Sequence, residues 1–306
     1  MFESAEIGHK LKKSEYKREE PKLRQALLKA QYDLLDNGKF PVIILVNGVD
    51  GAGKGETVNL FNEWMDPRHI HTHAFGAMTD VEREQPEMWR FWRALPPKGH
   101  IGILFGSWYT DPILKRVMGH EKRAVFEHRL ERIRHHERML AAEGALILKL
   151  WFHLSKPAQK KRFKELLSSK KTAWRVGAGD WERWKHYDEF VDVCEDALRD
   201  TSTGEAPWQV IEGSDPQYRS LTAGRLLLDA LNARLKGPPP KLSPSAPPPE
   251  PPIDKKNVLN SLDYTKSLTP KAYDKRLEKA QARLNQLTRD REMQERSLVM
   301  VFEGMD

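Results

Sequence analysis

Residues 42–55, VIILVNGVDGAGKG, decide the fold of this chain. The apolar run at 41–46, rich in β-branched residues, leads into a glycine-rich turn, and ETVNLFNEWM at 56–65 has the composition of a helix. A short continuous apolar run is typical of a strand that is buried on both faces, as in a parallel sheet. The order strand, glycine-rich loop and helix is the context that a phosphate-binding loop requires.

The loop at 48–55, called the phosphate loop below, matches G-x-x-x-x-G-K, with Gly55 where Ser or Thr usually follows. Glycines let successive backbone N–H groups converge on one anion, and the next helix presents its positive N-terminus there. The lysine adds a mobile point charge for phosphate oxygens. A turn that binds nothing is the alternative. The residues expected to bind phosphate are Gly48, Gly51, Ala52, Gly53, Lys54 and Gly55.

The residue that usually binds Mg²⁺ in such a loop, the Ser or Thr after the lysine, is Gly55 here, and Thr57 lies two positions too late to replace it. Another residue must therefore hold the metal. Asp50, inside the loop, is the candidate carboxylate ligand for Mg²⁺. The alternative is an Asx-turn, in which the Asp50 side chain caps its own backbone. Both interpretations stay open at this point.

The rest of the chain alternates strand and helix patterns. This alternation predicts an α/β domain, a doubly wound parallel sheet of about five strands with helices on both faces, ending near Leu235. The further predicted strands lie at 71–77, 100–106, 145–154 and 207–213. The predicted helices include 20–36, 121–144 and 155–171.

The C-terminal part of the sequence starts again after a proline-rich stretch. Residues 237–253 cannot build a core and are expected to form a stiff linker between a first domain, 1–236, and a second segment, 254–306. LVMVFEGMD at 298–306 repeats the pattern of VIILVNGVD at 42–50, each after a Leu-spaced charged helix. We predict a tandem duplication whose second copy stops within its own phosphate loop, so the natural protein is expected to continue; a chance match is the alternative.

Composition narrows the class of partner. Lys and Arg outnumber Asp and Glu by 51 to 44, a net charge of +7 that favours polyanions without choosing among nucleic acid, nucleotide and phosphate chains. A solvated basic surface is the alternative. The sequence lacks the apolar run of about 20 residues that a membrane-spanning helix needs. Its N-terminus is charged, and it has one cysteine, Cys194, which fits a reducing compartment. We therefore expect a cytoplasmic protein without a membrane partner.

Several motifs agree in order with one family. They are residues 50–55 (DGAGKG), 62–68 (NEWMDPR), 89–99 (WRFWRALPPKG), 107–109 (SWY), 152–156 (FHLSK) and 206–208 (APW). In these motifs the chain resembles the polyphosphate kinase 2 family, specifically its two-domain polyphosphate:AMP phosphotransferases. The resemblance covers about residues 10–235 and the start of the second copy.

The resemblance implies a P-loop kinase fold with a helical lid and Mg²⁺-dependent phosphoryl transfer from inorganic polyphosphate to AMP, giving ADP. We expect no nucleic-acid partner, because an ATPase acting on nucleic acid, a third alternative, would need a strand-end acidic residue for Mg²⁺ and a water-positioning group, and neither is evident. A homo-oligomer is possible. By match to the family, Asp50 and Lys54 would be catalytic, with Asp50 linked to the metal. The nucleotide-site candidates are Glu82, Arg83, Arg90 and Arg93. The lid and polyphosphate candidates are Lys156, Lys160, Lys161, Lys171 and Arg175.

Each of these assignments has a plainer alternative. Glu82 and Arg83 would then form a surface ion pair, and the basic helix around Lys160 would be a solvated face. Trp89 and Trp92, at helical spacing, would be packing residues.

The family's second acidic motif is incomplete here. Where the family has Asp-Arg-Ser-Trp-Tyr, this chain has FGSWY at 105–109, so Phe105 replaces an acidic residue. Because phosphoryl transfer depends on positioning and charge neutralisation, we expect this half to be weakly active or inactive. Asp80 or Asp111 could compensate, or each could be an ordinary surface or capping residue. The alternative function is a non-catalytic domain that binds polyphosphate or nucleotide for regulation or assembly.

Overall fold

The computed structural model describes residues 1–237, 263, 265–293 and 296–302. The chain divides into two compact units, Met1–Leu242 and Ser243–Asp306, each of which is described by itself. The predicted linker at 237–253, apart from Gly237, and the predicted glycine turn at 304–306 lie outside the described residues.

The first unit is built on one five-stranded sheet in which every paired strand is parallel. The strand order β2-β3-β1-β4-β5 confirms the predicted doubly wound α/β fold. Each of the five predicted strands forms, although β2 ends three residues before the predicted boundary at 77. The strands are β1 (Val42–Gly48), β2 (Ile70–Ala74), β3 (Ile101–Phe105), β4 (Leu146–His153) and β5 (Trp208–Glu212).

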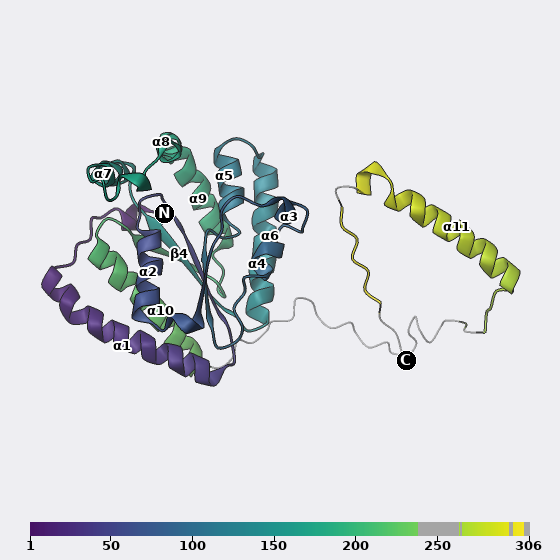
Figure 1. The fold of residues 1–306 in the computed structure, drawn as a ribbon, viewed down its shortest axis with the longest axis horizontal. Coiled ribbons are helices and arrows are strands. Elements are labelled where there is room, and N and C mark those ends of the chain that lie inside the picture. Colours follow the sequence, from purple (N-terminus) through teal and green to yellow (C-terminus); the bar gives the residue numbers. More distant parts are fainter. Residues whose placement is uncertain (238–262, 264, 294–295, 303–306) are drawn as a thin grey trace. The chain divides into compact units, whose positions relative to one another are not determined.

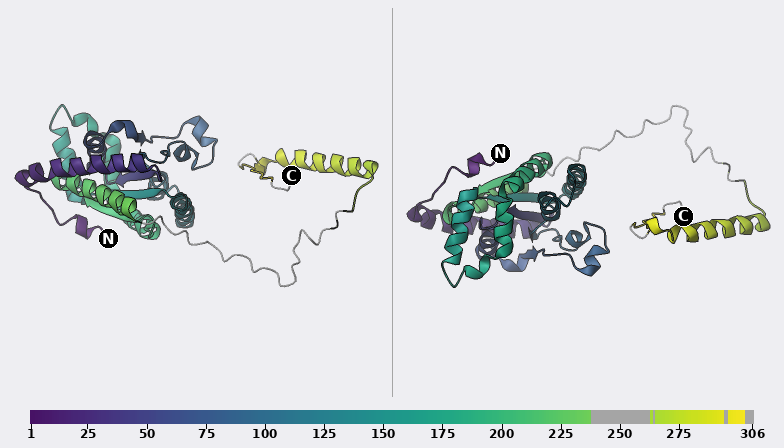
Figure 2. Two further views of the ribbon diagram at one scale, coloured as in Figure 1. Left: turned by 90° about the horizontal axis from the view of Figure 1, so that it is seen from below. Right: turned by 90° about the horizontal axis from the view of Figure 1, so that it is seen from above.

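Side chains of β1 point alternately into two separate cores. Val42, Ile44 and Val46 belong to one core, and Ile43 and Leu45 belong to the other. The helices on the first face are α1 (Lys13–Asn37), α2 (Lys54–Trp64) and α10 (Pro216–Lys236). The helices on the second face are α5 (Thr110–Val117), α6 (Arg123–Ala142) and α9 (Tyr187–Thr201). Figures 1 and 2 show the sheet between these two layers.

Helix α1 begins at Lys13, seven residues before the predicted start at 20. Its buried side chains, including Leu23, Leu27 and Leu34, lie in the predicted part, whereas the first turns are charged and carry no apolar periodicity. The sequence pattern therefore could not show the early start. The predicted end at 36 is confirmed to within one residue, since the helix ends at Asn37 and Gly38 caps it in the left-handed conformation with φ 56°.

Two helices with a small core of their own lie between β4 and α9 in the sequence. Helix α7 (Lys156–Leu167) begins at a Ser155 cap, and α8 (Ala178–Lys185) follows a 3₁₀ turn, η3 (Ala173–Arg175). Their core consists of Phe163, Leu166 and Val176 with Trp181 and Trp184 packed against it. This α7–α8 region corresponds to the predicted helical lid. Short helices α3 (Asp80–Arg83) and α4 (Trp89–Trp92) follow β2.

The second unit contains one long helix among its described residues, α11 (Pro270–Thr288), followed by a 3₁₀ turn, η4 (Arg291–Met293). The strand-and-turn pattern repeated at 298–306 forms no strand in its described part, since residues 298–302 have no regular structure and are exposed, and the predicted duplication stays a prediction. A parallel strand needs neighbours for its backbone hydrogen bonds, and the described residues of this unit include no other strand. Across the described residues, none of the helices has the length and apolar character needed to cross a bilayer.

Gly48, at the end of β1, gives the first testable prediction. It has φ 132°, and a Cβ atom there would lie 2.1 Å from the Phe152 carbonyl oxygen of β4, which is backbone and cannot rotate away. We expect Gly48→Ala to lower the free energy of unfolding by more than about 3 kcal/mol in urea denaturation. Gly55→Ala is the control, because a Cβ atom there would meet none of the described atoms within 4 Å and helical alanine is favoured. Equal stabilities of the two variants would contradict this expectation.

Candidate phosphate-binding site

The phosphate loop leaves the central strand where the connections of the sheet change direction. β1 lies between β3 and β4, so its carboxyl end opens onto the crevice in which α/β proteins bind ligands. Gly51 and Gly53 have φ of 81° and 87°, which explains the need for glycine there, and α2 begins at Lys54. Thr57 is buried and donates its hydroxyl to the Gly53 carbonyl.

Lys54 and Asp50, the two predicted catalytic residues, lie together in this loop. The Lys54 ammonium donates to the Gly48 carbonyl, lies 3.3 Å from the Val49 carbonyl oxygen and lies 3.5 Å from Asp50 Oδ1. Asp50 Oδ2 accepts a 2.7 Å bond from Arg183 Nε of α8. Burial favours a raised pKa for the Asp50 carboxyl, but the charges of Lys54 and Arg183 outweigh it and lower the pKa. Asp50 is thus a carboxylate between two cations rather than a cap of its own backbone.

A cavity of about 280 Å³, called the loop cavity here, lies against the phosphate loop. Apolar side chains form most of its wall: Val46, Phe75, Phe105, Ile113, Leu114, Trp151 and Phe190. The polar and charged side chains that line it are Asn47, Asp50, Lys54, Thr110 and Arg183. Within the described part of the chain, Asp50 contributes the single carboxylate of this wall, and Phe105 stands where the resemblance led us to expect a second.

Neither Asp80 nor Asp111 supplies the missing carboxylate, because neither is among the described residues that line the loop cavity. Asp80 is on the exposed surface and pairs with Arg83. Asp111 lines an adjoining cavity of about 340 Å³, but Arg129 at 2.7 Å and Lys115 at 3.0 Å hold its carboxylate. The contacts of both residues match the plainer of the two sequence interpretations.

The four nucleotide-site candidates separate into two groups. Arg90 lines the adjoining cavity, pairs with Glu82 at 3.3 Å and lies over the Phe75 ring at 5.0 Å. Arg83 and Arg93 are not among the described residues that line this cavity or the loop cavity. Arg83 pairs with Asp80 instead of Glu82, and Arg93 lies 4.8 Å from the Trp89 ring centre.

Trp89 and Trp92 have rim-type contacts of the kind that the packing interpretation describes, since Trp89 is half-buried next to Arg93 and Trp92 packs edge-on against His136. Phe91 is the core residue of α4, with 6% of its surface exposed, whereas Trp92 is 47% exposed. The helix is only one turn long, and Phe91 is on the side that it turns toward the core.

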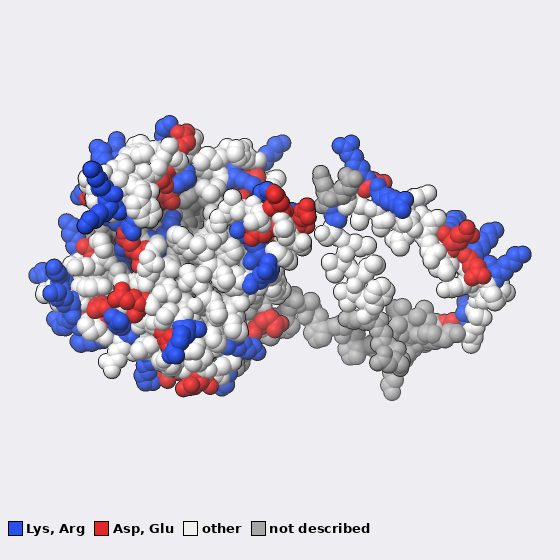
Figure 3. All heavy atoms as spheres, viewed as in Figure 1, with Lys and Arg blue, Asp and Glu red and all other residues white. Residues whose placement is uncertain are grey.

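The lid candidates are divided between surface and internal contacts. Lys156 pairs with Asp188 at 2.5 Å, and the Lys160 ammonium lies over the Trp184 ring at 4.9 Å. Lys161 and Lys171 are exposed. Arg175 reaches Glu56, the third residue of α2, at 3.2 Å. On the face shown in Figure 3, basic and acidic side chains are interspersed instead of forming one positive patch.

Three charged residues beside the phosphate loop were not among the predicted site residues. Arg183 holds Asp50, and Arg219 of α10, which is 3% exposed, holds Glu56 at 2.7 Å. Glu56 could have been singled out from the sequence, because an acidic side chain so close to an anion-binding loop opposes anion binding. Arg183 and Arg219 could not have been found in this way, because they are 133 and 163 residues away from their partners in the sequence.

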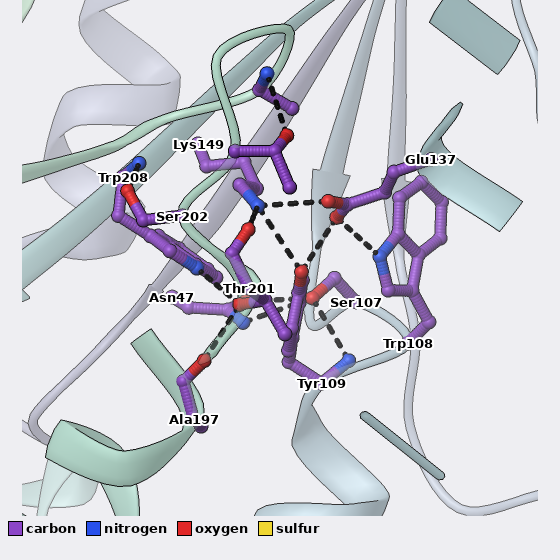
Figure 4. A network of polar contacts seen from close by, with 12 residues as sticks. Asn47, Ser107, Trp108, Tyr109, Glu137, Lys149, Ala197, Thr201, Ser202 and Trp208 are labelled. Atoms are coloured by element: carbon purple, nitrogen blue, oxygen red, sulfur yellow. Dashed lines mark hydrogen bonds and ion pairs between the residues drawn. The ribbon is translucent and has the colours of Figure 1, made fainter. Parts of the chain in front are cut away.

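A buried polar network holds the segment that follows β3 (Figure 4). The Lys149 ammonium, in the middle of β4 and fully buried, donates to Glu137 Oε2 at 2.8 Å and to the Thr201 carbonyl at 2.7 Å. Trp108 Nε1 and the Tyr109 hydroxyl donate to Glu137 Oε1 at 3.0 and 2.7 Å. Two residues of the 107–109 motif are therefore anchored to one buried carboxylate, which fixes the wall around Phe105.

Comparison with known proteins identifies relatives along the whole chain. The family model described as Polyphosphate kinase 2 (PPK2) matches residues 10–238. A polyphosphate:AMP phosphotransferase of Pseudomonas aeruginosa is 48% identical over the full chain, which covers 62% of that relative. An AMP/ADP-polyphosphate phosphotransferase of Meiothermus ruber is 32% identical over 68% of this chain and 78% of its own.

A solved structure of a polyphosphate kinase 2 has a similar fold. The crystal structure of polyphosphate kinase 2 from Arthrobacter aurescens matches with a TM-score of 0.72 and 30% identity, over 77% of this chain and 84% of its own. This likeness confirms the P-loop kinase-like fold. The chain spans about three fifths of the length of the Pseudomonas relative, 62%.

The buried ion pair gives the second prediction. We expect Glu137→Leu to destabilise the protein by about 3–5 kcal/mol, because it leaves the buried Lys149 ammonium without a counter-charge. The double variant Glu137→Leu with Lys149→Met should recover part of that loss, since no unpaired charge remains, although Trp108 Nε1 and the Tyr109 hydroxyl still lack their acceptor. Chemical denaturation of the three proteins measures both effects. A double variant less stable than the single one would show that charge isolation is not the cause.

His136 gives the third prediction, a pH dependence. It packs edge-on against Trp108, and burial lowers its pKa from 6.5 to about 4. The unfolded chain therefore takes up this proton at a higher pH than the folded chain does. The stability contributed by neutral His136 is complete above about pH 6.5 and falls as the pH drops toward 4, by about 3 kcal/mol.

The measurement compares wild type with His136→Gln, which cannot titrate, in urea denaturation at pH 7.5 and roughly pH 4.5. Wild type should lose more stability than the variant between the two values. An equal loss in both proteins would assign the pH dependence to other groups.

Proposed function

The chain belongs to the polyphosphate kinase 2 family, and we propose that it takes part in transfer of a phosphoryl group from inorganic polyphosphate to AMP, giving ADP. The observation that carries this proposal is the 48% identity, over the full chain, to a polyphosphate:AMP phosphotransferase. The intact strand, phosphate loop and helix of residues 42–64 support it, because they supply the phosphate cradle that such a reaction needs.

The geometry supports the proposed substrates as well. Backbone N–H groups of the phosphate loop and the N-terminus of α2 suit phosphate oxygens, and the Lys54 ammonium adds a charge beside them. The loop cavity of about 280 Å³ has an aromatic and aliphatic wall next to that cradle. Such a wall suits the planar base of a nucleotide whose phosphate lies in the loop. The exposed cations Lys161 and Lys171 of the lid region suit a polyphosphate chain at the edge of the site.

The proposed metal is Mg²⁺, held by Asp50. Mg²⁺ is often bound by one or two carboxylates together with substrate phosphates and water, so a single carboxylate beside a phosphate cradle fits this ion. Arg183 occupies Asp50 Oδ2 and would have to move away for this carboxylate to serve as a ligand. Bound there, the metal would neutralise phosphate charge. In the described residues no group of three or more His, Cys, Asp or Glu side chains could hold a metal without substrate oxygens.

A second candidate role for residues 1–236 is binding without efficient transfer. Phe105 cannot ligate a metal, and Asp50 is paired with Arg183. These two observations favour a domain that holds polyphosphate or nucleotide while the chemistry is slow. The names of the relatives give no support for low activity, and this part of the proposal stays a prediction.

The fourth prediction tests both roles in one assay. ADP formation from AMP and polyphosphate in the presence of Mg²⁺ is measured for the chain and for Phe105→Asp, Lys54→Ala and Lys29→Ala. We expect slow turnover, a rise of at least about tenfold in Phe105→Asp because a second carboxylate reaches the site, and loss of turnover in Lys54→Ala. Lys29, an exposed residue of α1, is the matched control and should leave the rate unchanged.

Each outcome separates the candidates. Absence of ADP formation in all four proteins, with polyphosphate binding retained, would leave the binding role and reject transfer by this chain. Turnover that Lys54→Ala leaves intact would place the chemistry away from this phosphate loop. No turnover together with no polyphosphate binding would reject both roles.

A further inference from the structure

One carboxylate beside the phosphate loop is surrounded by three arginines. Glu56 Oε1 accepts from Arg162 at 2.8 Å and lies 3.2 Å from Arg175, while Oε2 accepts from Arg219 at 2.7 Å. The three guanidinium groups, called the arginine cluster below, come from α7, η3 and α10. With Glu165 3.9 Å from Arg162 also counted, three positive charges face two negative charges, which leaves an excess of one at this position.

The arginine cluster touches the phosphate loop directly. A Cβ atom at Gly53 would lie 2.0 Å from Arg219 Nη1, and one at Gly51 would lie 3.4 Å from Arg162 Cγ. Gly53 therefore leaves space that the Arg219 side chain fills, whereas Arg162 and Phe163 lie in contact with Gly51. The cluster and the loop form one continuous surface, so an anion chain held by the loop would lie next to the cluster.

Arg219 is also incompletely paired although it is buried. Its side chain is 4% exposed, Nη1 donates to the Gly213 carbonyl at 3.3 Å, and Nε finds no hydrogen-bond partner among the described residues. An unpaired buried guanidinium N–H is costly, which indicates that Glu56 alone does not satisfy this group. A carboxylate offers two oxygens and one charge, whereas a phosphate group within a chain offers two non-bridging oxygens with the same charge, two bridging oxygens, and further charges on its neighbours in the chain.

We propose that the Glu56 carboxylate occupies the arginine cluster, of which the resemblance already implies Arg175 as a polyphosphate residue, until one phosphate group of a polyphosphate chain displaces it. The inference rests on the proposed function, because it takes polyphosphate to be the ligand. Glu56 acts as an internal substitute for phosphate and lowers the affinity of this domain for polyanions. It also connects the lid region to α2, through Arg162 and Arg175.

The position of Glu56 allows this exchange. It is in the first turn of α2, its side chain is 34% exposed, and Arg175 is 41% exposed. A flexible side chain at the surface of the cluster can rotate away without disturbing the core. Arg219 stays in place, because it is packed against Gly53. The site is thus fixed on its buried side and open on its lid side.

The test measures binding of a fluorescently labelled polyphosphate to the full chain by anisotropy. Glu56→Gln removes the charge and keeps the shape, and we expect it to bind about tenfold more tightly than wild type. Glu165→Gln is the matched control, because Glu165 lies in the same lid region, 3.9 Å from Arg162, and the net charge changes equally. It should alter the affinity by less than about twofold.

A double variant assigns the gain to the cluster. Arg175→Gln in the Glu56→Gln background should remove most of the gain, since Arg175 would be one of the released phosphate ligands. Equal gains in Glu56→Gln and Glu165→Gln would reduce the effect to net charge and overturn the site. Weaker or unchanged binding in Glu56→Gln would overturn it too, and would leave Glu56 a structural connection.

The outcome is independent of turnover. Tighter binding in Glu56→Gln without ADP formation by any variant would support the site and reject transfer by this chain. ADP formation by wild type with unchanged binding in Glu56→Gln would support the proposed function and reject the site. Absence of polyphosphate binding in every variant would overturn the site and remove the ligand on which the proposed function depends.

Discussion

The close passage of β1 past β4 at Gly48 is the constraint on which the phosphate site depends. Gly48 is paired with Phe152 of β4, and no side chain would fit between the two backbones. This contact directs the chain out of the sheet at the crevice and aims α2 at it, and it places the Gly48 carbonyl where Lys54 can bond to it. The loop, the helix terminus and the lysine thus owe their common position to one backbone approach.

On the other face of the sheet, the Lys149–Glu137 pair fixes the segment that follows β3, as Gly48 fixes the phosphate loop. A buried ion pair adds little net stability, because desolvation offsets most of its attraction. It does have strict geometry, and here Trp108 and Tyr109 share the acceptor carboxylate. The wall of the loop cavity is therefore fixed by polar groups that lie beneath it, and a residue such as Phe105 is held there whether or not it can assist chemistry.

The sequence predicted what is encoded locally. All five predicted strands form, and the phosphate loop followed from its own spacing, because both depend on neighbours within a few residues. Contacts made by distant charges were not predictable: Arg183 meets Asp50, and Arg219 meets Glu56, only after the chain has crossed the sheet. The apolar run at 298–302 forms no strand for a related reason, because such a run becomes a strand only where other strands can pair with it.

The site that results keeps its phosphate cradle while its charges satisfy one another. Lys54 and Arg183 neutralise Asp50, and the arginine cluster neutralises Glu56, so the cations best placed for phosphate are paired internally. The free energy of polyanion binding is the difference between the contacts that the polyanion makes with these cations and the internal ion pairs that it replaces. Glu56 and Asp50 therefore regulate affinity in opposite ways. Removing Glu56 frees three arginines for anion binding, whereas Asp50 can assist binding only through a metal ion, once Arg183 has released it.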